Sequence, residues 1–175
     1  MVFFLAVAGR DRPGIVAELS RVLFESGLNI EDSRMAIMHG HFAVALVVTG
    51  DPGDEVQLRA DLESVRDRLA LDTVTLSAIE GGSTPAALPT HIVTVYGADH
   101  PGIVHSVSSV LAQLEINITD LTTRLLGEDD QLYVMLLEVA LPGGLDPMTV
   151  EQRLQQVHTS QRVDVTVRQL DSDRL

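Results

Sequence analysis

Two short stretches of the sequence combine residue types that could hold a small charged ligand. The stretch 9–16 reads Gly-Arg-Asp-Arg-Pro-Gly-Ile-Val, and the stretch 97–104 reads Gly-Ala-Asp-His-Pro-Gly-Ile-Val. In each, the Asp-x-Pro-Gly segment directly precedes a helical pattern of apolar residues. The amino end of a helix carries backbone N–H groups without partners and a partial positive charge, so it favours a carboxylate. The neighbouring aspartate could receive an ammonium group.

The residues of these two turns have different expected roles. The proline fixes the start of the helix, and the next glycine lets a ligand approach the backbone because it has no side chain. The aspartate has an alternative interpretation as a helix cap, which capping preferences favour when the turn is considered alone. The residues concerned are Asp11, Pro13 and Gly14 in the first turn and Asp99, Pro101 and Gly102 in the second.

The two turns belong to an internal repeat. Six of their eight positions are identical, at a spacing of 88 residues between Gly9 and Gly97. The same spacing places Asn29-Ile30 on Asn117-Ile118, and the likeness resumes after an acidic insertion at 127–130. A repeat of this extent indicates duplication of one small domain.

The boundary between the repeats is visible in the composition. Residues 81–89 read Gly-Gly-Ser-Thr-Pro-Ala-Ala-Leu-Pro, which is uncharged and rich in residues that break helices and strands. We therefore predict a first domain at 1–80, a linker at 81–89 and a second domain at 90–175.

Apolar periodicity predicts the same six elements in each domain. Residues 2–8 and 91–96 are strand-like, and the segments after the two turns place apolar residues on one helical face. A hairpin with Gly40 at its turn follows, then a second helix and a last strand. The order βαββαβ, found twice, predicts an α+β protein of two ferredoxin-like domains, each an antiparallel sheet with two helices on one face.

One strand of each predicted hairpin is apolar on both faces. Residues 43–48 read Ala-Val-Ala-Leu-Val-Val, and residues 132–137 read Leu-Tyr-Val-Met-Leu-Leu. A sheet with helices on one side only should alternate apolar and polar residues. We therefore expect another sheet or subunit to cover part of the helix-free face.

The turn motif, the Asn-Ile pair sixteen positions after the proline and the βαββαβ order together resemble the ACT domain. That family comprises modules that sense small molecules, most often amino acids. Two such units that fill nearly the whole chain are similar to the glycine cleavage system transcriptional repressor family. The resemblance implies that units pair side by side with joined sheets and that ligands bind at the junction.

The resemblance also implies which residues would bind. One site would combine the first turn with the asparagine of the second unit, and the other site would combine the second turn with the asparagine of the first. Asn residues also commonly occupy turns, which is the alternative for this pair. The implied ligand-binding residues are Gly9, Asp11, Pro13, Gly14, Ile15, Asn117 and Ile118 in one site, and Gly97, Asp99, Pro101, Gly102, Ile103, Asn29 and Ile30 in the other.

The second unit departs from the first in one way that bears on the site. Gly27 corresponds to Glu115, and a residue other than glycine disfavours a left-handed helix end. We therefore expect the second helix to end differently and Asn117 to be displaced. Gly9 and Gly97 also lack side-chain donors, so degeneracy of one or both sites is an alternative.

Composition excludes several function classes. The 25 acidic residues exceed the 12 basic ones, giving a formal charge of −13, which disfavours direct binding of nucleic acid or an anionic membrane. No cysteine is present, and His39-Gly-His41 has no completing metal ligands, so we expect turn histidines and no metal site or cofactor. No catalytic motif occurs, no segment resembles a signal peptide or membrane span, and we expect a cytoplasmic protein.

These observations lead to one leading hypothesis. The protein is expected to be a non-enzymatic regulator that binds a small ligand, an amino acid, at the junction of two ACT-like domains. It would be a homodimer and signal through a protein partner such as a transcription regulator. The alternative is an ACT-like scaffold or oligomerisation module without ligand binding.

Overall fold

The structure is a computed structural model that describes residues 1–79, 87–127 and 132–170. The chain divides into two compact units, Met1–Thr84 and Pro85–Leu175, which are described separately. Most of the predicted acidic insertion at 127–130, and most of the predicted linker at 81–89, lie outside the described residues.

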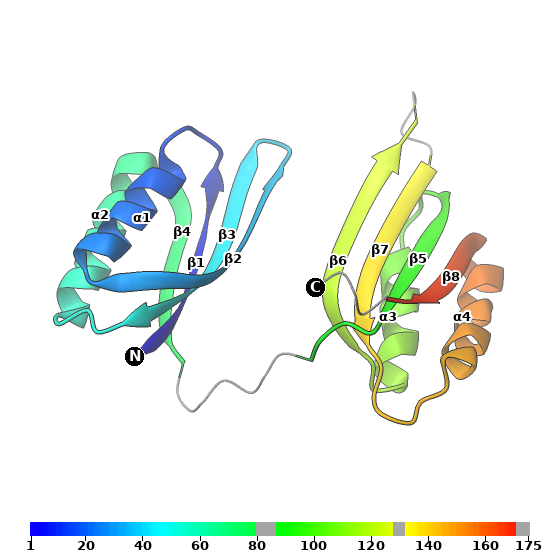
Figure 1. The fold of residues 1–175 in the computed structure, drawn as a ribbon. Coiled ribbons are helices and arrows are strands. Elements are labelled where there is room, and N and C mark those ends of the chain that lie inside the picture. The colour runs from blue at the N-terminus through cyan, green and yellow to red at the C-terminus, as the bar shows by residue number, and fades with distance from the viewer. Residues whose placement is uncertain (80–86, 128–131, 171–175) are drawn as a thin grey trace. The chain divides into compact units, whose positions relative to one another are not determined.

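Both units have the predicted βαββαβ order, and the ferredoxin-like fold class is confirmed (Figure 1). Unit 1 consists of β1 (Val2–Arg10), α1 (Ile15–Glu25), β2 (Leu28–Met38), β3 (His41–Gly50), α2 (Glu55–Leu69) and β4 (Leu71–Ala78). Unit 2 consists of β5 (His91–Ala98), α3 (Ile103–Gln113), β6 (Asn117–Leu126), β7 (Leu132–Ala140), α4 (Pro147–Gln161) and β8 (Val163–Gln169).

Each unit forms one four-stranded antiparallel sheet with both helices on the same face (Figure 1). The strand order is β2-β3-β1-β4 in unit 1 and β6-β7-β5-β8 in unit 2, so the strand that precedes each candidate turn is central. Alternate residues of a strand face opposite sides of the sheet. Phe3, Leu5 and Val7 of β1 therefore face the helices and are buried, as are Val93 and Val95 of β5.

The two cores share no residue, so each unit buries its own apolar face. Leu19, Val22 and Leu23 of α1 pack in the core of unit 1. Val107 and Leu111 of α3 pack in the core of unit 2. Such burial supplies most of the stability of short helices, which are marginal when isolated.

The prediction that the second helix ends differently from the first is wrong. Glu115 has φ +57° and Gly27 has φ +70°, so both residues are left-handed directly after the helix cap. Asn117 pairs with Ala140, the position that corresponds to the pairing of Asn29 with Thr49, and it is not displaced. The tertiary structure imposes the left-handed conformation on Glu115, at a cost of roughly 1–2 kcal/mol relative to glycine.

The predicted hairpin turn is present in unit 1. His39 and Gly40 both have positive φ and connect Met38 to its partner His41, which makes a two-residue turn of the kind whose twist matches that of the flanking strands. His39 and His41 are exposed at this turn. Among the described residues, no group of three potential metal ligands is found.

Candidate functional site

The turn between β1 and α1, and its counterpart between β5 and α3, have the same backbone conformation. Gly14 has φ +97° and Gly102 has φ +103°, and each is the N-cap of its helix. The first intrahelical bonds are Glu18 N–H to Gly14 O and Ser106 N–H to Gly102 O, both 2.9 Å. These φ values favour glycine, so the second glycine of the motif is required by the backbone.

Neither helix is capped by a side chain. The capping interpretation of Asp11 and Asp99 is therefore wrong in this structure. The backbone N–H of Asp11 donates to Gly40 O at 2.9 Å, which ties the turn to the neighbouring hairpin. Asp11 and Asp99 are exposed. The first-turn N–H groups, which no side chain caps, keep the polarity that favours an anion.

The first glycine of the motif has a packing role that the sequence did not reveal. A Cβ at Gly9 would lie 2.9 Å from Leu71 Cα, and one at Gly97 would lie 2.9 Å from Val163 Cγ1. Both distances are shorter than ordinary contacts, so β1 and β5 approach their neighbouring edge strands closely here. Leu71 and Val163 each begin an edge strand, but only the structure reveals the approach.

The two isoleucines of the turns are core residues. Ile15 and Ile103 are buried and pack against the sheets. Their backbone N–H groups, and not their side chains, are therefore the groups that a ligand at the helix end could reach. The neighbouring Pro13 and Pro101 are exposed.

The asparagines lie at the opposite end of the sheet from the turn of their own unit. Asn29 pairs with Thr49 of β3, whereas Gly9 pairs with Phe42 of the same strand. Seven residues along a strand span roughly 24 Å. Asn117 is equally far along β7 from the partner of Gly97. The turn and asparagine of one unit therefore cannot contact the same small ligand.

The asparagine side chains face the side without helices. In unit 1, Leu28 belongs to the core and Ile30 pairs with the buried Val48, so strand alternation turns Asn29 the other way. In unit 2, Ile116 and Ile118 both pack towards the core and Asn117 between them does not. Ile30 itself is partly exposed, so the two Asn-Ile pairs are not equivalent in burial.

The second turn has polar neighbours that the first lacks. Tyr133 pairs with Gly97, where unit 1 has Phe42 beside Gly9. Burial raises the pKa of the Tyr133 hydroxyl above its usual value, and the negative charge of Asp99 raises it further. The hydroxyl donates to the sulfur of Met135 at 3.7 Å. The aligned repeats show the difference between Phe42 and Tyr133, but the influence of Asp99 on the tyrosine hydroxyl follows only from the structure.

His100 connects the second turn to the end of α4. Its Nε2 lies 2.7 Å from Gln161 O, at the last residue of that helix. The corresponding residue in unit 1 is Arg12, so this contact occurs on one side of the repeat only. The turn in unit 2 is therefore held by a helix end as well as by its own strand.

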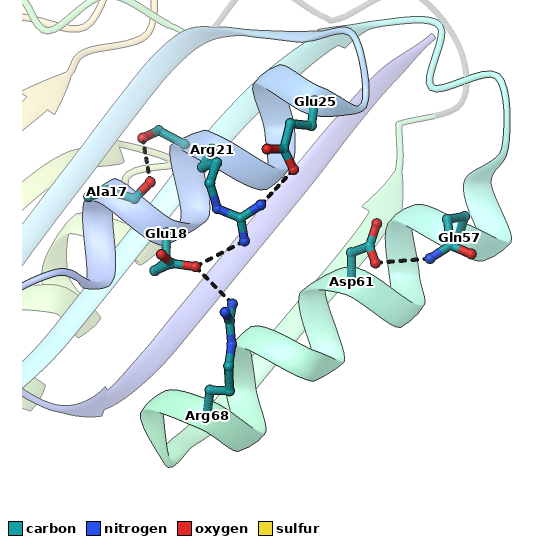
Figure 2. Close-up of polar contacts among 8 residues, drawn as sticks. Ala17, Glu18, Arg21, Glu25, Gln57, Asp61 and Arg68 are labelled. Atoms are coloured by element: carbon teal, nitrogen blue, oxygen red, sulfur yellow. Dashed lines mark hydrogen bonds and ion pairs between the residues drawn. The ribbon is translucent and has the colours of Figure 1, made fainter.

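The helix layer of unit 1 carries an ion-pair network beyond its turn. Glu18 accepts from Arg21 at 3.0 Å and from Arg68 of α2 at 2.8 Å, as Figure 2 shows. The hydrogen bond from Arg21 lowers the pKa of Glu18 below its usual value of 4.5, and the charges of Arg21 and Arg68 act in the same direction. The network joins α1 to α2 on the exposed side of the helices.

No helix within residues 1–79, 87–127 and 132–170 is long and apolar enough to cross a membrane.

Three proteins illustrate what this chain is similar to. The Escherichia coli glycine cleavage system transcriptional repressor is 24% identical over 152 residues, which are 85% of this chain and 79% of that protein. A solved protein from Galdieria sulphuraria, described as unknown, is 31% identical with a TM-score of 0.80, covering 97% of this chain and 98% of its own. A Streptomyces coelicolor phosphoserine phosphatase is 30% identical over 62% of this chain but only 26% of the enzyme.

The pattern of the ACT domain matches residues 2–75 and 90–168, which together make up most of the chain and fall on the two βαββαβ units. Together with the likeness to the glycine cleavage repressor, these matches show that the chain is a tandem protein of the ACT domain family.

Proposed function

We propose that this protein is a non-enzymatic, cytoplasmic regulator that binds an amino acid on its two glycine-containing turns and signals through a protein partner. The observation that carries the proposal is the repeated turn: a left-handed glycine, helix N–H groups without a side-chain cap, and an exposed aspartate. The N–H groups would bind the α-carboxylate and the aspartate the α-ammonium group. An amino acid is the smallest abundant ligand with both charges on one carbon.

The proposed asparagine contribution comes from another unit. The asparagine of the same unit is roughly 24 Å away along the sheet. We propose that each turn is completed by the asparagine of another unit whose sheet joins the first edge to edge. Both asparagine side chains face the helix-free side of their sheet. The amide would therefore reach a ligand at the turn around the edge of the sheet.

Exposed apolar residues on the edge strands support such pairing. Ile30, Met35 and Ile37 of β2 share the register of buried β3 residues, yet they are exposed, and Leu121 and Leu125 of β6 are exposed in the same way. Edge strands also present unpaired backbone groups. A second unit beside each edge would cover both features.

Thermal unfolding in the presence of single amino acids tests the proposal, beginning with glycine and serine at millimolar concentration. A ligand at about 100 times its Kd adds roughly 2.7 kcal/mol to the stability of the folded state. We expect a selective rise in Tm that is reduced in the double variant Asp11→Ala/Asn117→Ala, which alters the first site only, and lost when Asp99→Ala and Asn29→Ala are added. Each single variant should be measured as well, because the aspartate lies in the turn before the helix whereas the asparagine side chain faces the helix-free side of its sheet.

The variant Glu151→Ala is the control, since it removes an exposed carboxylate from α4. A selective rise that persists in the fourfold variant would place the ligand elsewhere. A flat response to all amino acids, with folding intact, would favour the alternative that the chain is a scaffold or oligomerisation module.

The proposal that the output passes through a protein follows from charge. The formal charge of −13 opposes the polyanionic DNA backbone, which rewards clustered basic residues. The protein alone should therefore not retard a DNA fragment in a gel at physiological salt. Specific retardation would contradict this part of the proposal.

A further inference from the structure

The helix-free face of unit 2 carries an ordered set of side chains, here called the outer face. Cross-strand partners point to the same side of a sheet, so the register defines three rows across β6, β7, β5 and β8. The rows are Asp120, Glu138, Ile92 and Arg168; then Thr122, Leu136, Thr94 and Thr166; then Arg124, Val134, Tyr96 and Asp164.

The four corners of the outer face alternate in charge. Asp120 and Arg168 end the first row, and Arg124 and Asp164 end the third, and all four are exposed. Neighbouring corners are roughly 14 Å apart, both along and across the strands, so they are too far apart to pair with one another. No ion pair of the described residues joins two of these corners.

Asp164 has one neighbour on the helix side. Its Oδ1 lies 3.5 Å from His158 Nδ1, and that nitrogen is also 2.7 Å from Val163 O. The contact is an ion pair only when the histidine is protonated. The Asp164 side chain is 57% exposed, so a cation from a second protein can still approach its carboxylate.

The centre of the outer face is partly exposed and contains four apolar residues, Ile92, Val134, Leu136 and Tyr96, together with Thr94 and the half-buried Glu138. Tyr96 is 40% exposed and Leu136 is 39% exposed, and Ile92 and Val134 lie between them and the charged corners. A hollow of about 450 Å³ lies over this region, with Ile92, Val134 and Leu136 in its lining together with Asp120, Arg124 and Glu138. Tyr96 stands next to the hollow on β5.

We infer that the outer face binds the outer face of a second copy of this chain. Two sheets that pack face to face as a symmetric pair are related by a twofold axis in the plane between them. An axis parallel to the strands would place Asp120 opposite Arg168 of the copy, and Arg124 opposite Asp164. An axis across the strands would pair Asp120 with Arg124, and Arg168 with Asp164. Either way every corner meets an opposite charge.

The apolar residues of the centre are complementary under the same symmetry, whereas Glu138 would lie opposite Ile92 of the copy in the first arrangement and opposite Val134 of the copy in the second. Tyr96 would face Val134 of the copy in the first arrangement and Ile92 of the copy in the second. Both of these residues line the hollow, so the exposed ring would fill it in either case. Two hollows would be filled by two rings, as an isologous contact requires.

The corresponding face of unit 1 lacks this pattern, which favours a second copy of unit 2 as the occupant. Its matching corners are Asp32, Ser77, Ala36 and Thr73, and its centre is largely alanine. Unit 1 could therefore oppose charge at no more than one corner. The three rows of the outer face cover roughly 17 by 19 Å, which is smaller than a standard protein interface, so we expect a weak dimer in the micromolar range.

Sedimentation equilibrium of the full chain, without amino acids, tests the inference over roughly 1–100 μM protein, the range expected for a small interface. The wild type should change from the 18.9 kDa monomer to twice that mass as concentration rises. Asp120→Arg should raise the dimer Kd by at least about tenfold, because it puts two like charges together at two symmetric positions. Asp32→Arg, at the matching position of unit 1, should leave the Kd unchanged.

Two compensating variants make the test specific. Asp120→Arg/Arg168→Asp should restore the dimer if the twofold axis runs along the strands. Asp120→Arg/Arg124→Asp should restore it if the axis runs across them. Restoration by one of the two confirms the pairing and identifies the axis.

The inference is overturned if the wild type remains monomeric at 100 μM, if Asp120→Arg leaves the Kd unchanged, or if neither double variant restores the dimer. Circular dichroism of each variant verifies that it is folded, which these exposed positions should allow. The result is independent of the proposed ligand, because the measurement contains none.

Discussion

Units 1 and 2 have the same fold, but different side chains connect their helices and surround their turns. In unit 1 the helices are joined across their exposed side by Glu18, Arg21 and Arg68 (Figure 2). In unit 2, Ser106 and Ser109 occupy the positions of Glu18 and Arg21 at the same spacing of 88 residues. The duplicated backbone therefore does not depend on this network, and the surface of each copy has diverged around a common core.

The difference extends to the turns and to the helix-free faces. Unit 2 places Tyr133 and His100 beside its turn and has the charged outer face, whereas unit 1 has Phe42, Arg12 and an alanine-rich face. Unit 1 therefore has the simpler turn, and unit 2 has more polar and charged side chains around its turn and on its helix-free face. Substitutions at matched positions can therefore distinguish residues that both units require for folding from residues that matter in one unit only.

The two glycines that precede the turns give the largest expected difference between matched substitutions. An added Cβ would meet backbone in unit 1, at Leu71 Cα, but a side-chain methyl first in unit 2, at Val163 Cγ1. Backbone cannot rotate away, so Gly9→Ala should destabilise unit 1 by about 2–3 kcal/mol and Gly97→Ala should destabilise unit 2 by about 1–2 kcal/mol. Urea unfolding followed by circular dichroism measures both.

The two tyrosines, Tyr96 and Tyr133, both lie in unit 2, so tyrosine fluorescence reports that unit alone. Gly97→Ala should therefore lower the midpoint of the fluorescence transition, whereas Gly9→Ala should lower only the midpoint of the remaining transition. Equal losses for the two variants would contradict the difference between backbone and side-chain contacts.

The left-handed residues after α1 and α3 give the next difference. Glu115→Gly should stabilise unit 2 by about 1 kcal/mol, because glycine adopts φ near +57° without the strain of a Cβ. Gly27→Ala, the reverse change at the matched position, should destabilise unit 1 by about 1 kcal/mol. The fluorescence midpoint should rise for Glu115→Gly. A decrease would mean that the Glu115 side chain contributes more than its backbone conformation costs.

The fold was predictable from the sequence because local patterns and the repeat agreed. The apolar spacing of Leu58, Leu62 and Val65 specified a helix, and the same residues are buried in α2. Every element was also seen twice, so an ambiguous segment in one unit could be interpreted from its counterpart. Only the end of α3 was mispredicted, because local propensity at Glu115 is overridden by the packing of the elements on either side.

The candidate site was less predictable, since it depends on distances between elements. The motif identified Gly9 and Gly14 together, yet one is required by the approach of β4 and the other by a positive φ. The side of the sheet that Asn29 faces follows from the burial of its neighbours, which the sequence alone did not fix. Contacts such as His100 with Gln161 join residues far apart in the chain, and no short pattern encodes them.

The smallest expected effect concerns the network of unit 1 and its dependence on pH. The pKa of Glu18 is lowered in the folded state, so the carboxylate stabilises unit 1 above its ordinary pKa of about 4.5, and that contribution is lost as pH falls through the lowered value. Glu18→Gln should therefore reduce the urea midpoint of unit 1 at pH 6, and the difference from the wild type should shrink as the pH is lowered below the ordinary pKa of glutamate. Because the groups are exposed, 1 M salt should shrink the difference at pH 6 as well. The fluorescence transition of unit 2 should be identical in the two proteins at every pH, since Ser106 stands where unit 1 has Glu18; a shift there would mean that the two units unfold as one.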